Sequence, residues 1–150
     1  MTAFDAIAQA VADNGCTRVF GVPGGGPNLD LIGAFNRHGV EFVLAHTETG
    51  AAIMAATFSV VTNTVSAVIV TRGPGAASAV NGAASATLDR APLLVITDCV
   101  PEATRARTGH QRFDQRALMR PVTLRTARIG NDVTQEQLVD LIATATGPLA

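Results

Sequence analysis

Hydrophobic positions along the chain follow two periods in turn, one typical of amphipathic helices and one typical of short buried strands. Apolar residues from Phe4 to Ala12 recur every three to four positions, and the Asn14-Gly15 pair ends the helix that this spacing predicts. Residues 17–22 form a short apolar run that predicts a strand. A glycine-rich turn follows, in which Pro27 can begin a helix that runs to about residue 37.

The alternation of strand and helix continues to about residue 97. The pattern predicts strands at residues 41–45, 66–71 and 93–97, with helices at about residues 47–61 and 74–89 between them. Strands and helices that alternate in this way imply an α/β fold, a three-layer sandwich in which helices cover both faces of a central parallel sheet.

The last third of the chain has a less regular pattern. A polar, arginine-rich stretch through residue 112 predicts a long loop, and loops of this length are often functional. We expect a short helix at residues 115–119, a strand at residues 122–129 and a helix at residues 135–146, which Thr134 and Gln137 begin with a capping box. Residues 1–150 are expected to form one domain.

Composition argues against several classes of function. Charged residues make up 15% of the chain and the formal net charge is −1, which does not fit binding to nucleic acid or to an anionic membrane. The 11 basic residues are all arginine, so lysine-based Schiff-base chemistry and the lysine of a P-loop are excluded. Cys16 and Cys99 lie far apart and lack metal-ligand spacing, so neither a metal site nor a disulfide framework is expected, and the reducing cytoplasm fits best. The longest apolar stretches are interrupted before they could span a bilayer, so the protein is expected to be soluble.

The strand-to-helix turns are the places to look for a ligand, because ligands of open α/β sheets bind at the carboxyl ends of the strands. Three predicted turns lie there, at residues 21–26, 46–52 and 71–77, and two of them are rich in glycine. The first turn lacks the Gly-x-Gly-x-x-Gly spacing of a dinucleotide site, and no acid ends the second strand. A nucleotide-binding α/β domain is therefore kept only as an alternative.

Five short motifs occur in a fixed order along the chain. They are Gly-Val-Pro-Gly-Gly at residues 21–25, His-Thr-Glu-Thr-Gly-Ala-Ala-Ile-Met-Ala at 46–55, Thr-Arg-Gly-Pro-Gly-Ala at 71–76, Arg-Ala-Pro-Leu-Leu-Val-Ile-Thr at 90–97 and Arg-Pro-Val-Thr at 120–123. Together they resemble the N-terminal pyrimidine-binding domain of thiamine-diphosphate-dependent enzymes, in particular the acetolactate synthase and 2-oxo acid decarboxylase group. The resemblance covers nearly the whole chain.

The resemblance gives Glu48 the central role. An acid at this position hydrogen-bonds a pyrimidine ring nitrogen of the cofactor and favours the imino form of the 4′-amino group, which removes the proton from the thiazolium C2. A dry, apolar site strengthens such a hydrogen bond. The other interpretation of Glu48 is a solvated acid in the first turn of a helix, where the helix dipole favours it.

The two glycine turns are expected to contact the cofactor. The positions that the resemblance implies are Pro23, Gly24, Gly25, Thr71, Pro74 and Gly75. Proline and glycine also begin helices and form tight turns in most proteins, and both roles can hold together. Ser78 stands where the family often has asparagine, so the contact implied there depends on serine.

The loop at residues 109–115 resembles the family's Phe-Gln-Glu-x-Asp-Gln stretch. Gln111 matches the glutamine that faces the substrate and the intermediate. His110 replaces the aromatic residue and Arg112 replaces the acid, which suggests a substrate other than pyruvate, with an extra anionic group. His110 is either a proton shuttle or an exposed loop histidine without function. Arg72 replaces a small residue, and is either a clamp for a substrate carboxylate or a surface charge.

The resemblance also implies a partner. Family members bind the diphosphate through Mg²⁺, held by a Gly-Asp-Gly turn and a later asparagine on a second domain, and this sequence contains no Gly-Asp-Gly. The two halves of such a site usually come from different chains, so we expect a homo- or hetero-oligomer and no activity from this domain alone. FAD, which some synthases of the group carry, would bind largely to a middle domain outside this sequence.

The expected function is therefore the pyrimidine-binding half of a thiamine-diphosphate-dependent lyase or transferase. Its substrate would be a small 2-oxo acid, decarboxylated with carboligation or with release of an aldehyde. The sequence is interpreted either as a piece of a longer enzyme or as one subunit of a split enzyme. The alternatives are a non-catalytic dimerisation or regulatory module of the same fold, and the nucleotide-binding domain named above.

Overall fold

Four parallel strands form the centre of the fold in the computed structural model, which describes residues 2–104, 106, 107, 109–130 and 132–147. The strands are β1 (Arg18–Val22), β2 (Glu41–Leu44), β3 (Ser66–Val70) and β4 (Leu93–Thr97). Their order in the sheet is β2-β1-β3-β4, so β1 and β3 are central. Gly21 of β1 lies opposite Leu44 of β2 and Ile69 of β3. A side chain on Gly21 would meet the Ile69 carbonyl, so only glycine fits there.

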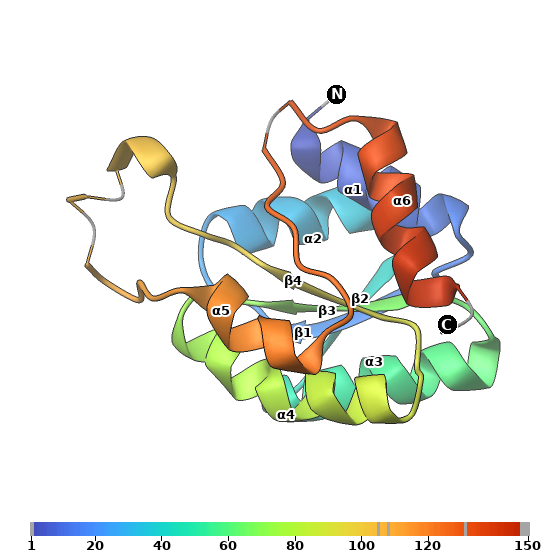
Figure 1. The fold of residues 1–150 in the computed structure, drawn as a ribbon. Helices are drawn as coiled ribbons and strands as arrows, with labels where there is room; N and C mark the ends of the chain where they lie inside the picture. The colour runs from blue at the N-terminus through green and yellow to red at the C-terminus, as the bar shows by residue number, and fades with distance from the viewer. Residues whose placement is uncertain (1, 105, 108, 131, 148–150) are drawn as a thin grey trace.

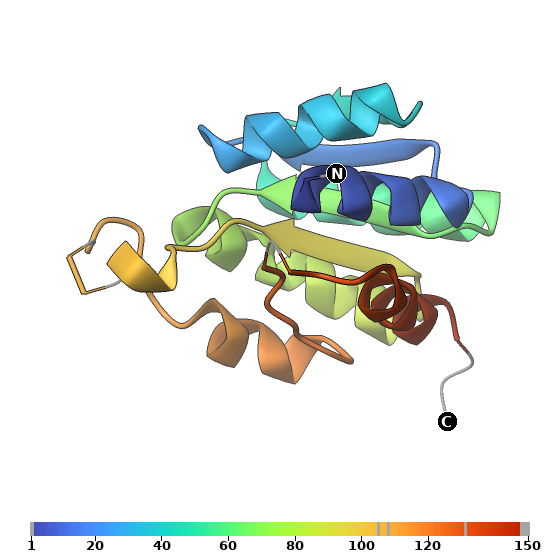
Figure 2. The same ribbon diagram turned by 90° about the horizontal axis from the view of Figure 1, so that it is seen from above.

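Helices cover both faces of this sheet. The helices are α1 (Ala3–Asp13), α2 (Pro27–Arg37), α3 (Glu48–Thr62), α4 (Pro74–Leu88), α5 (Gln115–Met119) and α6 (Gln135–Thr146), with 3₁₀ helices η1 (Glu102–Thr104) and η2 (Arg120–Val122). Helices α1, α2 and α6 lie on one face, and α3 and α4 lie on the other (Figures 1 and 2). The predicted three-layer α/β sandwich is confirmed.

The two faces of the central strands bury two separate hydrophobic clusters. Val19, Ala67 and Ile69 point toward α1, α2 and α6, whereas Phe20, Val68 and Val70 point toward α3 and α4. This alternation follows from the two-residue period of a β-strand. All five residues of β3 are buried, as expected for a central strand of a parallel sheet.

Local signals in the sequence begin the helices. Helices α2 and α4 each start with a glycine at positive φ followed by proline, with φ 47° at Gly26 and 67° at Gly73. Helix α3 begins after Thr47, whose Oγ1 accepts a hydrogen bond from the Gly50 N–H at 3.1 Å. The predicted capping box of Thr134 and Gln137 begins α6 and is confirmed.

The predicted strand at residues 122–129 is wrong. The structure has η2 up to Val122, and residues 123–130 then run to α6 without pairing to the sheet. Two guanidinium groups hold this segment from its sides. Arg125 binds the Asp140 carboxylate of α6 at 2.6 Å, and Arg128 donates to the Val100 carbonyl at 3.1 Å. The segment is thus fixed by side-chain contacts instead of by a ladder of backbone hydrogen bonds.

No helix in the described ranges combines the length and the apolar character that a membrane crossing requires.

Candidate functional site

The candidate residues gather at one edge of the sheet, because the carboxyl ends of parallel strands lie together. The turn after β1 holds Pro23, Gly24 and Gly25, and the turn after β3 begins with Thr71. Glu48 is the first residue of α3, directly after the turn that follows β2. The structure therefore brings all three predicted turns to the same edge.

Close packing joins the turns that follow β1 and β3. A side chain on Gly24 would collide with the Thr71 hydroxyl, and a Cβ on Gly75 would lie 2.7 Å from Cγ2 of Thr71. Real Cβ atoms do not approach other atoms so closely, so both positions require glycine or a shift of Thr71. Thr71 is half-buried between the two glycines.

The Glu48 carboxyl lies near Gly75 of this pair. Its Oε1 lies 3.6 Å from the point that a Cβ on Gly75 would occupy, and the residue is half-buried. Within the described part of the chain, no group donates a hydrogen bond to this carboxyl. A half-buried carboxyl without an internal donor can accept or share a proton with a ligand at the same edge.

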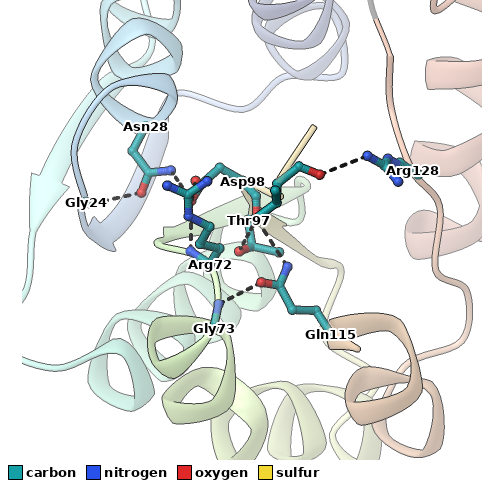
Figure 3. Close-up of polar contacts among 9 residues, drawn as sticks. Gly24, Asn28, Arg72, Gly73, Thr97, Asp98, Gln115 and Arg128 are labelled. Atoms are coloured by element: carbon teal, nitrogen blue, oxygen red, sulfur yellow. Dashed lines mark hydrogen bonds and ion pairs between the residues drawn. The ribbon is translucent and has the colours of Figure 1, made fainter. Parts of the chain in front are cut away.

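Asp98 is the centre of a polar network beside these turns (Figure 3). Its Oδ1 accepts hydrogen bonds from Nδ2 of Asn28 at 3.2 Å and from the backbone N–H of Arg72 at 2.8 Å. Asn28 in turn accepts from the Gly24 N–H at 2.9 Å. The network thus runs from the turn after β1, through the end of β4, to the turn after β3.

Gln115 of α5 extends the same network. Its Oε1 accepts from the Gly73 N–H at 2.6 Å, and its Nε2 donates to the Asp98 carbonyl at 3.2 Å (Figure 3). Gln111, at φ 54°, places its own carbonyl against Gly73, where a side chain would collide with it. The long loop therefore returns directly to the turn after β3.

The remaining predicted residues differ in burial. His110 and Ser78 are exposed, and Ser78 is used through its carbonyl, which accepts from the Thr49 hydroxyl at 2.5 Å. Gly25 and Pro74 are exposed, and a side chain on Gly25 would meet open space. Pro23 and Gln111 are half-buried. Their roles remain predictions, as does the role of Glu48.

Sequence reasoning missed Asp98 and Asn28. Asp98 directly follows β4, at the edge of the sheet where ligands bind. An acid directly after a predicted strand is a signal in the sequence that could have identified it. Asn28, with 2% of its surface exposed, lies in the first turn of α2, where sequence alone does not distinguish a buried asparagine from an exposed one.

Two concave surfaces occur in the C-terminal part of the fold. Two hollows of about 210 and 610 Å³ are lined by residues of the segment 114–141, and neither is lined by a predicted site residue. Among the described residues, no group of three or more His, Cys, Asp or Glu side chains could hold a metal ion. The candidate site thus lies outside both hollows, at the edge of the sheet.

Comparison with known proteins identifies the family. Residues 1–118 match the family described as thiamine pyrophosphate enzyme, N-terminal TPP binding domain. The chain is 36% identical over 119 residues to the acetolactate synthase large subunit of Lactococcus lactis, covering 78% of this chain and 20% of that protein. It is 32% identical over 118 residues to the acetolactate synthase of Bacillus subtilis, again 78% of this chain and 20% of that protein.

A third relative covers more of the chain. A probable 2-ketoarginine decarboxylase of Pseudomonas aeruginosa is 32% identical over 148 residues, which is 97% of this chain and 26% of that protein. The chain thus spans about a fifth to a quarter of the length of these curated relatives. The match over residues 1–118, together with the parallel sheet and its glycine turns, shows that the chain belongs to the thiamine pyrophosphate enzyme family and corresponds to its N-terminal TPP-binding domain.

Proposed function

We propose that this chain forms the pyrimidine-binding half of an active site that acts on a 2-oxo acid. The observation that carries the proposal is the Glu48 carboxyl, which is half-buried, lacks an internal hydrogen-bond donor among the described residues, and faces Gly75 with Oε1 3.6 Å from its Cβ position. Relatives named as acetolactate synthases and as a decarboxylase support the substrate class.

The residues at this edge fit thiamine diphosphate. Thr71 fills the space beside Gly24 and Gly75, whereas the Cβ position of Gly25 meets open space, so a flat ring would approach the backbone of the first turn there. When bound, the cofactor supplies the nucleophilic carbon for attack on the 2-oxo group. Glu48 would hold a proton against a ring nitrogen of the pyrimidine, and Pro23, Gly25, Thr71 and Pro74 would orient the ring.

The loop residues Gln111 and His110 would serve the substrate side of the site. Gln111 lies next to Gly73 through its backbone, so its half-buried side chain belongs to the same edge as Glu48. His110 is exposed and could exchange protons with solvent or substrate. Ser78 would contribute to the site by position, because its carbonyl in the first turns of α4 accepts a hydrogen bond from Thr49 of α3, the residue after Glu48.

The other half of the site would come from a diphosphate-binding domain or subunit. That half would hold Mg²⁺ and the diphosphate, and FAD, if the enzyme carries it, would bind outside this chain. We propose a homo- or hetero-oligomer that works in the cytoplasm, with no nucleic acid or membrane partner. The formal net charge of −1 argues against nucleic acid and anionic membranes as partners, and two cysteines that lie far apart in the sequence and indicate no disulfide framework fit a reducing compartment.

The direct test is Glu48→Gln in the assembled enzyme, with the diphosphate-binding half present. We expect the rate of hydrogen–deuterium exchange at C2 of bound thiamine diphosphate to fall about 10²- to 10⁴-fold, because the variant cannot share its proton with the ring. NMR of the acid-quenched cofactor measures that rate. Glu136→Gln is the matched control, because Glu136 is likewise a first-turn acid, on α6, and is exposed. Equal exchange rates in the Glu48→Gln and Glu136→Gln variants would refute the proposal.

A further inference from the structure

Asp98 is a buried carboxylate that the resemblance leaves without a role. Only 9% of its side chain is exposed, and Asn28, which donates to it, is 2% exposed. A buried carboxylate is costly unless its oxygens are hydrogen-bonded or paired with a cation. Asp98 meets this condition with groups from two different turns, Asn28 of α2 and Arg72 after β3.

One oxygen of Asp98 carries both of these contacts. Oδ1 accepts from Nδ2 of Asn28 at 3.2 Å and from the Arg72 N–H at 2.8 Å. Because Asn28 also accepts from the Gly24 N–H at 2.9 Å, a continuous chain of hydrogen bonds joins Gly24 to Arg72. Gly24 and Thr71, which precedes Arg72, are the residues that pack directly on each other beside Glu48.

The second oxygen of Asp98 makes a different kind of contact. Oδ2 lies 3.6 Å from Nε of Arg72, which is too far for a hydrogen bond, and this buried Nε has no hydrogen-bond partner within the described residues. The contact is therefore electrostatic. Oδ1 thus accepts the hydrogen bonds that link the two turns, whereas Oδ2 lies beside the charge of Arg72.

We propose that Asp98 is a positioning residue that fixes the Gly24 turn and the Thr71–Gly75 turn at the separation that the cofactor's pyrimidine requires. The inference rests on the proposed function, because it assigns both turns to the cofactor. Asp98 acts through Asn28 and the Arg72 backbone, and it does not touch the ring itself. Small displacements of groups that orient a reacting molecule reduce rates strongly, so loss of this bridge should affect binding and activation of the cofactor.

Four variants separate the two oxygens, namely Asp98→Ala and Asp98→Asn, each with and without Arg72→Met. Asp98→Ala removes the bridge and the counter-charge of Arg72. Asp98→Asn keeps an acceptor at the position of Oδ1 but turns an N–H toward Nε of Arg72, so donor faces donor. Adding Arg72→Met to Asp98→Asn removes that conflict and keeps the bridge. If Asp98 positions the turns, Arg72→Met should restore the Asn variant and should not restore the Ala variant.

The measurements are the dissociation constant of thiamine diphosphate and the rate of C2 hydrogen–deuterium exchange at saturating cofactor, in the assembled enzyme. We expect Asp98→Ala to weaken cofactor binding on the order of tenfold and to slow exchange, with or without Arg72→Met. The Asn variant with Arg72→Met should return to within about threefold of wild type. Asp89→Ala is the control, an exposed acid at the end of α4, and should match wild type.

Each other outcome overturns the inference. If Asp98→Ala binds and activates the cofactor like Asp89→Ala, Asp98 has no positioning role. If Arg72→Met restores the Ala and Asn variants equally, Asp98 only balances a charge. If Asp98→Ala does not fold, the test is the comparison of Asp98→Asn with and without Arg72→Met. If Arg72→Met then restores neither the cofactor's dissociation constant nor the C2 exchange rate, the inference is overturned. Glu48→Gln in the same assay separates the two proposals. If Glu48→Gln does not slow exchange, the proposed function is contradicted, whereas if Glu48→Gln slows exchange and Asp98→Ala does not, only the role of Asp98 is contradicted.

Discussion

At the scale of single residues, burial separates the two cysteines of the chain. Cys16 is 3% exposed and its thiol donates to the Arg18 carbonyl at 3.2 Å. Burial raises the pKa of the Cys16 thiol to about 11, although the contact with Arg18 opposes the shift. Cys99 is exposed beside Asp98. The thiolate is the reactive form of cysteine, so the two thiols should differ in reactivity.

We predict that an alkylating reagent at pH 8 labels Cys99 in the native protein and leaves Cys16 unmodified. At that pH roughly one in a thousand Cys16 groups is ionised, and the side chain is also inaccessible. Mass spectrometry of peptides after labelling measures both sites, and unfolding in denaturant should make both react. Labelling of Cys16 at the rate of Cys99 in the native protein would contradict the buried position.

The residues of the site show which roles a sequence can predict. Glu48 could be proposed because a glutamate inside a recognisable motif has a known chemical use, and its role stays a prediction. Asp98 belongs to no such motif, and its function depends on Asn28, 70 positions away, and on Arg72. Contacts between distant turns arise only when the strand order is known, so the sequence did not reveal them.

At the scale of elements, the contact between α3 and α4 depends on Gly82. A Cβ on Gly82 would collide with Cβ of Ala52 and lie 3.0 Å from the Thr49 carbonyl. Both helices are rich in alanine, and Ala52 and Gly82 are buried. The small residues therefore allow the two backbones to approach closely on one face of the sheet.

We predict that Gly82→Ala lowers the free energy of unfolding by about 1–3 kcal/mol through overpacking, despite the higher helix propensity of alanine. Gly33→Ala on α2 is the matched control, because a Cβ there meets only the Nη1 atom of Arg37, at 3.5 Å. That variant should gain up to about 1 kcal/mol. Urea denaturation measures the free energy of unfolding of both variants. A stabilised Gly82→Ala variant would contradict the prediction, because it would show that α3 and α4 can move apart without loss of stability.

Element boundaries were predicted best where glycine or proline marks them. Helices α2 and α4 begin at Pro27 and Pro74 as expected, since each follows a glycine that adopts positive φ. The region 123–130 was predicted poorly, because Val122, Leu124 and Ile129 occur in a β-like run but are separated by arginines that bind other parts of the fold. Tertiary contacts override local preference there.

At the scale of the whole molecule, one ion pair ties helix α1 to helix α2 and makes stability depend on acid pH. Asp5 accepts from Nη2 of Arg37 at 2.6 Å and from the Thr2 hydroxyl at 2.7 Å. The Arg37 guanidinium, followed by Thr2, lowers the pKa of the Asp5 carboxyl to about 2. Because the folded pKa lies below the unfolded value of about 4, the stabilisation is complete above pH 4 or so and is lost as pH falls through about 2.

We predict that Arg37→Met lowers the free energy of unfolding at pH 5 and that its difference from wild type shrinks between about pH 4 and pH 2. Protonation of Asp5 removes the interaction in wild type, so the two proteins converge. Denaturant titrations at several pH values measure this difference, and a difference that stays constant down to pH 2 would mean that Asp5 does not carry the dependence. His38, 3.8 Å from Asp5, is present in both proteins and does not distinguish them.

The side chain of Gln115, at the start of α5, holds together the two ends of the loop between β4 and α5. It donates to the carbonyl of Asp98, where the loop begins, and accepts from the N–H of Gly73, which lies beside the loop's last residues. A loop whose ends are held together loses little when its interior changes, because each doubling of its length costs only about 0.6 kcal/mol. Changes in the length of the segment between Asp98 and Gln111 should therefore leave the turns around Glu48 in place, whereas Gln111 itself packs against Gly73 and has to stay. The free energy of folding thus allows this segment to vary in length more readily than the turns that it connects, which makes it a practical place to insert new sequence.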